Sequence, residues 1–235
     1  MAIANIDRPA SLVEEVCQRL AADIRSGELD DGGWLPSERM LAGQLGVSRP
    51  VVREATKRLE LQGLVEVLHG VGTKVVDRLH NPLSSSLELL LPDEADRLRQ
   101  LNEARLAIEP QAARLAAERS KPAQRRAMWT IQERLVAAQS AEEAITHDMA
   151  FHRAVADASG NVIFRTVLDS LADLGRATRE RTIGRNGKQT PIAHHRDILE
   201  AIDRRDAAAA HDAMHRHIVA AGKDLAADLS RRSRK

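Results

Sequence analysis

Hydrophobic residues near the start of the chain recur at the spacing of a helix. Leu12, Val16, Leu20 and Ile24 are each four residues apart, so they fall on one face of a helix. A serine just before this run can cap the helix, which predicts a helical segment over about residues 11–26.

Two short helices are predicted after a loop. Ser37 follows a proline and can cap the first helix, and Gly46 ends it. Ser48 can cap a second helix over 49–62, with Pro50 in the first turn, where a missing N–H costs nothing. The glycine between the two helical patterns indicates a tight turn, so the two helices are expected to pack on each other.

The second of these helices has one apolar face and one cationic face. At about 100° per residue, the two sets separate cleanly. The apolar positions are Val52, Ala55 and Leu59, and the cationic positions are Arg49, Arg53 and Lys57. A helix of this kind, held by a partner helix, can lie in the major groove of DNA, where arginine reads guanine edges and phosphates. From charge alone, an ordinary solvated face with Glu54 and Glu60 nearby is an equally good interpretation.

A hairpin follows, and the order of elements favours the DNA interpretation. Residues 64–68 and 73–76 alternate like two strands around the flexible tip 69–72. The order is then helix, turn, helix and a two-stranded wing.

Residues 35–76 also contain a long ordered series of individual residues. In order these are Leu35-Pro36-Ser37-Glu38-Arg39, Leu45-Gly46-Val47-Ser48-Arg49, Val52-Arg53-Glu54-Ala55, Leu59, Gly63-Leu64-Val65, and Gly70 through Gly72-Thr73. This series resembles the winged helix-turn-helix of the GntR family of bacterial transcription regulators. Because the match extends over about forty positions, it is specific.

The resemblance implies which residues contact double-stranded operator DNA. The residues implied in phosphate or base contacts are Arg39, Ser48, Arg49 and Arg53, and the wing tip His69-Gly70 is implied to reach toward the minor groove. The chain departs from some family members at Pro50 and Val51, where those members carry hydroxyl residues that hydrogen-bond to DNA. Direct readout is therefore expected to rest on the arginines.

Beyond the wing the pattern changes to a linker and then to almost continuous helix. Residues 79–94 are interrupted by Asn81-Pro82 and three serines, which predicts the linker. The candidate helices after it are 94–119, 121–139, 141–158, 161–185, 191–203 and 206–230. Such a series of amphipathic helices predicts an antiparallel bundle. The predicted organisation is mainly α, with a winged helix-turn-helix domain at 1–78, a linker at 79–94 and an all-α domain at 95–235.

Composition supports helices, but net charge does not by itself indicate DNA binding. Hydrophobic residues make up 43% of the chain and aromatic residues only 2%, so the core must be aliphatic. The net charge is +1, and residues 1–78 hold 10 basic and 12 acidic residues, so that domain is slightly acidic. DNA binding must then depend on where cations are placed rather than on their number.

Compartment and membrane association can also be predicted from the sequence. A single cysteine, Cys17, excludes an internal disulfide and fits a reducing cytosol. The chain has no apolar run of about 18 residues and no signal peptide. A cytoplasmic, nucleoid-associated bacterial protein without membrane contact is expected.

Four polar residues fall on apolar faces of the candidate helices. Asp148 and His152 lie one turn apart, and His195 and His217 each lie in the apolar stripe of a later helix. Buried polar groups must be satisfied, and three imidazoles with one carboxylate can achieve this by binding a divalent ion of the zinc, nickel or manganese type. For any one of these histidines alone, a satisfied core histidine is the simpler interpretation.

Arg105 is another polar residue in an apolar stripe. A guanidinium in such a place needs a carboxylate, which either Glu109, one turn further on, or an anionic effector can supply. Asn161 could line the same pocket, although capping of a helix after Gly160 explains it equally well.

Residues of about 95–222 resemble the FCD-type ligand-binding domain of the FadR subfamily of GntR regulators. Many such domains carry Asp-x3-His on one helix and single histidines on two later helices, which match Asp148, His152, His195 and His217. The resemblance implies that Arg105 and the metal ion hold a carboxylate effector from two sides.

The expected function is a homodimeric repressor that depends on a metal ion and senses a small carboxylate such as an organic or sugar acid. One alternative is a regulator in which the ion itself is the signal. Another is a metalloenzyme fused to a DNA-binding module, but no general base beside the ligands and no nucleophile motif support an enzyme.

Overall fold

The computed structural model describes residues 11–27, 33–76 and 93–232. The chain divides into two compact units, Met1–Leu83 and Ser84–Lys235. Most of the predicted linker 79–94 lies outside the described residues.

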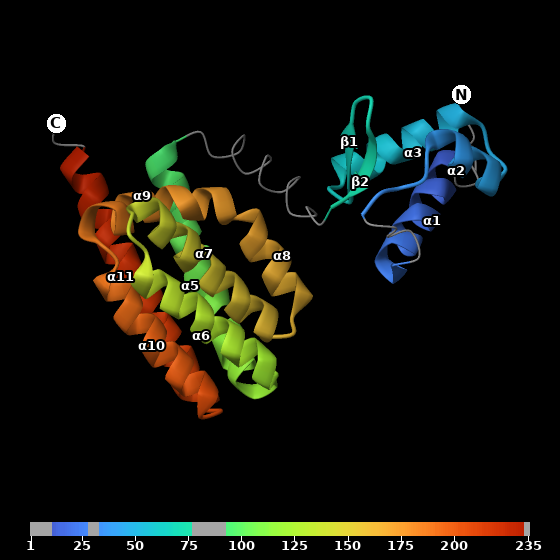
Figure 1. Ribbon diagram of the computed structural model, residues 1–235. Helices are drawn as coiled ribbons and strands as arrows, with labels where there is room; N and C mark the ends of the chain where they lie inside the picture. Colours follow the sequence, from blue (N-terminus) through green and yellow to red (C-terminus); the bar gives the residue numbers. More distant parts are fainter. Residues whose placement is uncertain (1–10, 28–32, 77–92, 233–235) are drawn as a thin grey trace, which may run out of the picture. The chain divides into compact units, whose positions relative to one another are not determined.

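The first unit begins with three helices at the expected places (Figure 1). Helix α1 spans Leu12–Ser26, α2 spans Glu38–Leu45 and α3 spans Arg49–Leu61. The Ser11 hydroxyl accepts a hydrogen bond from the Glu14 amide at 3.2 Å, which satisfies a free donor at the start of α1. Between α2 and α3, Gly46 takes a left-handed conformation with φ of 66°, which allows the tight turn.

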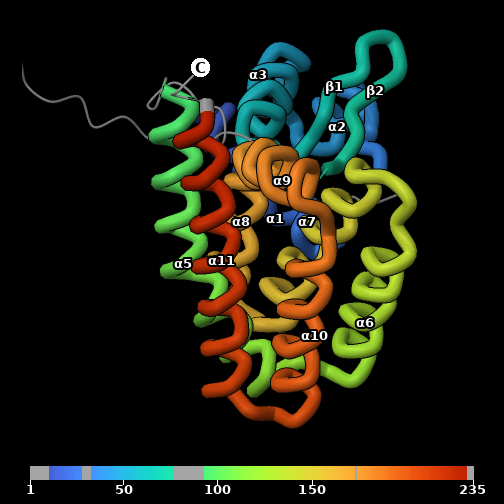
Figure 2. The backbone as a smooth tube through the Cα atoms, turned by 90° about the vertical axis from the view of Figure 1, so that its left-hand side faces the viewer, coloured from blue at the N-terminus to red at the C-terminus, as the bar shows by residue number. Residues whose placement is uncertain are grey.

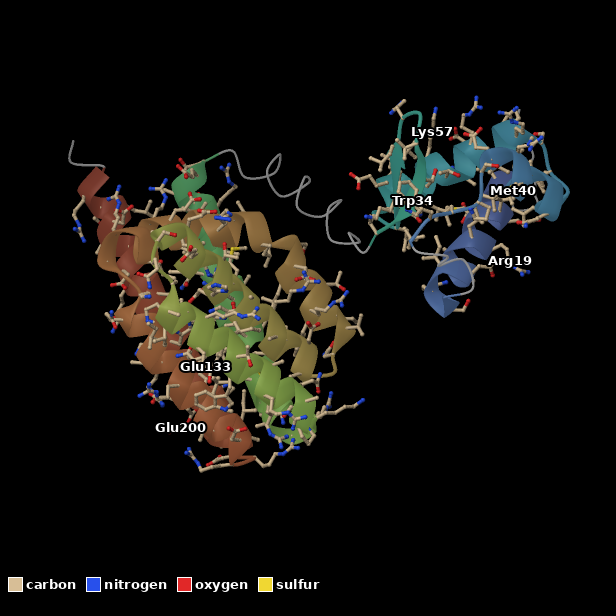
Figure 3. All side chains as sticks on the ribbon, viewed as in Figure 1. Arg19, Trp34, Met40, Lys57, Glu133 and Glu200 are labelled. Carbon is tan, nitrogen blue, oxygen red and sulfur yellow. The ribbon has the colours of Figure 1, made fainter. Side chains whose placement is uncertain are left out.

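The apolar faces of these helices form a core of their own. The buried residues of this core are Val16, Cys17, Leu20, Leu35, Leu41, Ala42, Val52, Ala55, Leu59 and Val65. On α3 the expected apolar side is inside, and Arg49, Arg53 and Lys57 are exposed on the opposite side. Met40, which keeps the helical spacing of α2, is 53% exposed and lies at the surface (Figure 3).

A two-stranded wing completes the first unit. Strand β1, Val65–Leu68, pairs antiparallel with β2, Gly72–Val75, and Val65 lies opposite Val75. Trp34 forms a bridge with Lys74 on the other edge of β2. The wing is therefore anchored to the chain segment that leads into α2, and the predicted hairpin is confirmed with strand ends shifted by one residue.

The second unit is a helical bundle, as expected. Its helices are α5 (Glu94–Arg119), α6 (Pro122–Ala137), α7 (Ala141–Ala158), α8 (Val162–Ser170), α9 (Ala172–Asn186), α10 (Gln189–Asp203) and α11 (Ala207–Arg232). Figure 2 shows the long helices α5 and α11 side by side in opposite directions. No helix in the described part of the chain is long and apolar enough to cross a membrane.

The core of the bundle is aliphatic, as the composition predicted. Its buried residues are Ala113, Ala116, Ala117, Met128, Phe151, Val155, Ala158, Ile198, Leu199, Ala201, Ile202, Ala210, Ala213, Met214 and Ile218. Alanines on α5 share this cluster with larger side chains on α10 and α11, and small side chains let helices approach closely.

One predicted helix is wrong. The segment 161–185 is two helices, because the chain breaks at Leu171, whose φ is −99° and ψ is 4°. No glycine or proline marks the break. The residues before it, Asp169 and Ser170, are buried, and α8 and α9 run in different directions (Figure 1). Tertiary packing has overridden a continuous helical pattern.

Candidate functional site

The cationic face of α3 carries one arginine that is held by a neighbouring helix. Arg53 donates from Nε and Nη2 to the two Glu38 oxygens, at 3.0 Å and 2.8 Å. A bidentate pair of this kind fixes the plane of a guanidinium. Arg39 and Arg49 are exposed and form no ion pair with another described residue.

The carboxylates near this face have other partners. Glu54 lies 3.9 Å from Arg58, and Glu60 accepts a hydrogen bond from the Val67 amide of the wing at 2.9 Å. Glu54 and Glu60 therefore interact elsewhere, whereas Glu38 is the carboxylate that pairs with a cation of this face.

The remaining predicted DNA contacts are also at the surface. Ser48 is at the N-cap position of α3, but its hydroxyl forms no capping hydrogen bond. His69 and Gly70 are exposed at the wing tip, and Gly70 has a φ of 76°, which an L side chain rarely adopts. A cavity of about 710 Å³ between α3 and the wing is lined by Arg53, Lys57 and the wing tip, among others.

In the bundle, the structure brings the four predicted metal ligands together. Asp148 and His152 come from α7, His195 from α10 and His217 from α11, and all four are buried. One ligand atom from each lies within 4.8 Å of all the others. The Nε2 atoms of His152 and His217 are 3.2 Å apart, and His195 Nε2 is 3.4 Å from Asp148 Oδ1.

Burial sets the protonation of this cluster. It lowers the pKa of His195 to about 3 and also lowers the pKa values of His152 and His217. Burial opposes ionisation of Asp148, but the Arg179 guanidinium and the three neighbouring histidines together outweigh it and hold the pKa of Asp148 below its usual range. At neutral pH the cluster is therefore three neutral imidazoles and one carboxylate, the forms that bind a metal ion.

Several atoms of the cluster have no hydrogen-bond partner among the described residues. Within the described part of the chain, Asp148 Oδ1 and both ring nitrogens of His195 are buried and lack a hydrogen bond. The His195 ring stacks on Phe151, with ring centroids 3.7 Å apart. Leaving such polar atoms unsatisfied in an apolar site is costly. A divalent ion would satisfy Asp148 Oδ1 and one ring nitrogen of His195, so these residues fit a metal ion.

Two further residues complete the site, and the sequence did not assign them to it. Glu109 binds His152 Nδ1, which turns His152 Nε2 toward the other ligands. Arg179 donates from Nε to Asp148. Glu109 was recognisable only as one of two partners for Arg105. Arg179 lies in the arginine-rich segment 176–185, where spacing alone does not distinguish it from surface arginines.

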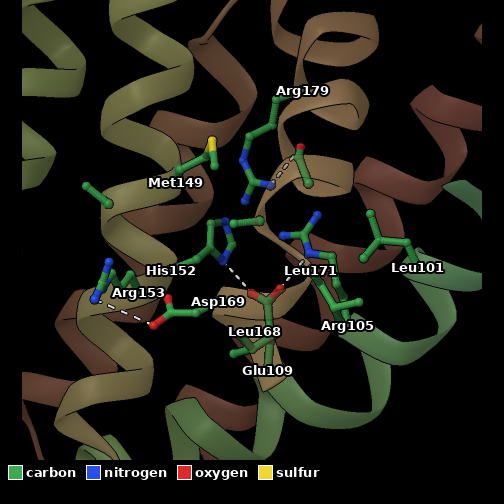
Figure 4. A pocket seen from close by; sticks show the side chains of 13 residues that line it. Leu101, Arg105, Glu109, Met149, His152, Arg153, Leu168, Asp169, Leu171 and Arg179 are labelled. Carbon is green, nitrogen blue, oxygen red and sulfur yellow. Dashed lines mark hydrogen bonds and ion pairs between the residues drawn. The ribbon is translucent and has the colours of Figure 1, made fainter. Parts of the chain in front are cut away.

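A cavity of about 280 Å³ opens beside the cluster (Figure 4). It is lined by Leu101, Arg105, Glu109, Met149, Ala150, His152, Arg153, Leu168, Asp169, Leu171, Ala172, Gly175 and Arg179. Arg105 is 4% exposed and donates from Nε to Glu109 at 2.5 Å. Its Nη2 atom is buried and has no hydrogen-bond partner among the described residues. The intrahelical partner considered from the sequence is therefore present, and a guanidinium donor still remains for a second anion.

Asn161 is not among the residues that line this cavity. Its Oδ1 accepts hydrogen bonds from the amides of Ile163 and Phe164, at 3.0 Å and 3.3 Å, at the start of α8. The structure thus gives Asn161 the capping role that was the alternative to effector binding.

Family models match both units of the chain. Residues 12–75 match the model described as bacterial regulatory proteins, gntR family, and residues 100–220 match the FCD domain. The chain resembles a solved structure of a GntR protein from Streptococcus agalactiae, with a TM-score of 0.73 and 29% identity over 90% of this chain and 99% of that one.

Curated relatives match most of the chain. The HTH-type transcriptional regulator Mce2R of Mycobacterium tuberculosis is 39% identical over 190 residues, which are 78% of this chain and 76% of the relative. A protein of Escherichia coli strain K12, named as a regulatory protein of an L-lactate dehydrogenase operon, is 31% identical over 220 residues, 89% of this chain and 84% of the relative. This chain therefore belongs to the GntR family of bacterial transcription regulators and is a DNA-binding member with an FCD domain, not an enzyme.

Proposed function

We propose that this regulator binds a divalent metal ion and a small carboxylate in its FCD domain, and that the carboxylate controls operator binding by a homodimer. The observation that carries the proposal is the buried Nη2 atom of Arg105, which has no hydrogen-bond partner among the described residues and lies in a cavity beside the Asp-His cluster. A buried guanidinium donor without a partner calls for an anion.

Charge balance favours the same ligand. With neutral imidazoles, the positive charges of Arg105 and Arg179 balance the negative charges of Glu109 and Asp148. A divalent ion adds two positive charges, and a monocarboxylate effector offsets one of them. The cavity volume of about 280 Å³ lies just below the usual range for small-molecule sites, about 300–1,000 Å³, which favours a small ligand. A small organic or sugar acid therefore fits, and the relative named for an L-lactate dehydrogenase operon supports an acid of this class.

In this proposal the ion is held by Asp148, His152, His195 and His217. Bound there, an ion of the zinc, nickel or manganese type supplies a Lewis acid for a carboxylate oxygen. Glu109 keeps the His152 ring in the tautomer that leaves Nε2 for the metal, and Arg105 binds the effector from the cavity side.

Helix α9 offers a route from this site toward the start of the bundle. Arg179 on α9 contacts Asp148, and Arg181, two residues later, lies 2.6 Å from Glu94 and 3.3 Å from Asp228. Glu94 is the first residue of α5, the helix that the chain enters after the DNA-binding unit. A shift of α9 on effector binding would therefore be transmitted to the start of α5, which follows the DNA-binding unit along the chain.

In the DNA-binding unit, we propose that phosphates and base edges are contacted by Arg39, Ser48, Arg49 and Arg53. We also propose that His69 and Gly70 at the wing tip contact the minor groove. The bidentate pair with Glu38 fixes the plane of the Arg53 guanidinium, which supports a fixed contact by this residue. Two copies of α3 related by a two-fold axis would read a pseudo-palindromic operator, and the regulator would act as a repressor.

The proposal can be tested by direct ligand binding to full-length, metal-loaded protein. A panel of small organic and sugar acids should include one that raises the melting temperature of the wild type, since a ligand specific to the folded state stabilises it by mass action. Arg105→Gln should remove that shift, and Arg99→Gln, an exposed arginine of the same helix, should keep it. An unchanged shift in Arg105→Gln would contradict the proposed carboxylate site.

A second candidate is that the metal ion itself is the signal. It is favoured by the ligand cluster, whose four donors are already close and buried before any acid is considered. Under this alternative, chelation alone changes operator affinity, and no acid of the panel does.

A further inference from the structure

One acidic residue of the effector cavity has no role in the proposed carboxylate site. Asp169, near the end of α8, lines the cavity and is 9% exposed. In Figure 4 His152 lies between Asp169 and Arg105, so the acidic residue and the proposed anchor are at different ends of the cavity.

Two guanidinium groups lie near Asp169 but beyond hydrogen-bond distance, and their side chains are more exposed than that of Asp169. Arg153 Nη2 and Arg165 Nε lie 3.5 Å and 3.8 Å from Asp169 Oδ2, beyond the hydrogen-bond range of about 3.2 Å. The Arg153 and Arg165 side chains are 51% and 29% exposed, against 11% for Asp169. Water screens the half-exposed Arg153 guanidinium, and Arg165, whose Nε atom is buried, is shared with Asp157 at 3.7 Å, so neither neutralises Asp169 fully.

The surroundings of Asp169 call for a hydrogen-bond donor. Leu168 and Leu171, its neighbours in sequence, also line the cavity and restrict water there. An enclosed carboxylate between apolar side chains is costly unless a donor satisfies it, and a second carboxylate beside it would be repelled. A hydroxyl or ammonium group on the ligand would supply the donor.

We infer that Asp169 selects the effector by the group at the end of the acid opposite its metal-bound carboxylate. A hydroxyl or an ammonium group there is accepted, and a second carboxylate is rejected. The inference rests on the proposed function, because it takes the first carboxylate to be held by Arg105 and the metal ion. The effector class then narrows to hydroxylated or amino monocarboxylates, such as short sugar acids, and excludes dicarboxylates.

Acids that differ only at their last carbon provide the test. Lactate, glycerate and tartronate share an α-hydroxy acid and end in a methyl, a hydroxymethyl and a carboxylate group. Gluconate and glucarate make the same hydroxymethyl-to-carboxylate change on a longer chain. Their dissociation constants are measured by titration calorimetry on full-length, metal-loaded wild type. In the series that binds, the hydroxymethyl acid should bind about 10-fold or more tightly than its dicarboxylate, as expected for a hydrogen bond to a charged group.

Variants assign this selectivity to Asp169. Asp169→Asn should bring the two acids to within about 2-fold, because the amide can donate to a carboxylate. Asp157→Asn is the matched control, since Asp157 also lies near Arg165, at 3.7 Å, but does not line the cavity. Arg153→Gln should keep or widen the preference for the hydroxymethyl acid, and it provides a second test if Asp169→Asn fails to fold.

The outcomes separate the inference from the proposed function. If no acid of either series binds, both are overturned. If acids bind but the dicarboxylate is equal or preferred, or if Asp169→Asn leaves the selectivity unchanged, the inference is overturned and the carboxylate site stands. If the wild type prefers dicarboxylates and Arg153→Gln loses that preference, Arg153 rather than Asp169 recognises the distal group of the acid.

Discussion

The Nε2 atoms of His152 and His217 lie 3.2 Å apart in the interior of the bundle. Two zinc-bound imidazole nitrogens at the tetrahedral angle would be about 3.3 Å apart, given Zn–N bonds of about 2.0–2.1 Å. Because Glu109 binds the other ring nitrogen of His152, the Nε2 atom of His152 is left without a proton and available to a metal ion. The pair is therefore already spaced as two ligands of one ion.

Metal removal should lower the stability of the protein. We expect one divalent ion per chain, and its loss by chelation should remove about 2.7 kcal/mol of folding free energy at an ion concentration 100 times the dissociation constant. Melting curves with and without chelator measure this. His217→Ala should lack the chelator effect, whereas His211→Ala, a partly exposed histidine of the same helix, should retain it.

The chelated protein should become less stable as pH falls. The pKa of His195 is lowered from 6.5 to about 3, because burial disfavours the charged ring. The unfolded chain then binds a proton that the folded chain does not, so stability is full above about pH 6.5 and is lost as pH falls toward 3. Urea unfolding of chelated protein at a series of pH values measures the slope, and a flat profile between pH 7 and 4 would contradict the buried neutral histidines.

Gly175→Ala should weaken the site, although alanine usually stabilises a helix by about 0.5–1 kcal/mol relative to glycine. A Cβ at Gly175 would lie 3.1 Å from Arg179 Nη1, which donates to the Gly175 carbonyl oxygen at 3.0 Å. Displacement of Arg179 would loosen its contact with Asp148, so we expect metal affinity to fall about 10-fold, by analogy with loss of a metal site's outer partners.

Gly184→Ala is the matched control for this substitution. It lies on the same helix, and its Cβ would meet only the Arg179 carbonyl oxygen, at an ordinary 3.9 Å. Competition with a fluorescent chelator gives both affinities. Equal metal affinity in the two variants would show that Arg179 does not support Asp148.

The bundle itself was predictable because its helices are long and keep their apolar spacing. The same apolar spacing indicated four candidate metal ligands, because each is a polar residue within an apolar stripe. They are Asp148, His152, His195 and His217. What could not be predicted depends on tertiary packing.

The break at Leu171 has no glycine or proline to mark it, and it brings Leu168, Asp169 and Ala172 into the cavity lining. Arg179 was hidden among other arginines of α9. For Arg105 the sequence offered two partners, Glu109 and an anionic effector, and the structure is compatible with both. Glu109 binds the Nε atom, and the Nη2 atom is buried without a hydrogen-bond partner among the described residues.

Specific DNA binding should depend on Arg49 and on the pair of Arg53 with Glu38. Arg49→Ala should weaken binding to a duplex selected from a random pool by about 10- to 100-fold, the range for a bidentate base contact, and leave helicity unchanged. Glu38→Gln should weaken it less, because Arg53 keeps its charge but loses its orientation. Arg19→Ala, an exposed arginine of α1, should behave as wild type in the same fluorescence-anisotropy titration.

Glu94→Gln should separate effector binding from the DNA response. Removal of its charge weakens the 2.6 Å contact with Arg181 and so the connection from α9 to the start of α5. We expect the variant to bind acid and operator with unchanged affinities, but the acid should no longer shift operator affinity. Asp96→Asn, two residues away and paired with Arg99, is the control and should respond normally.

In the proposed regulation, a carboxylate acts on DNA binding only through the metal-loaded site. The most direct measurement is the dissociation constant of the operator complex, with and without a stabilising acid, for metal-loaded and chelated wild type. We expect the acid to change operator affinity by about 10- to 100-fold in the metal-loaded protein and to have no effect after chelation. An unchanged operator affinity with every acid of the panel, or an equal effect in the chelated protein, would contradict the account.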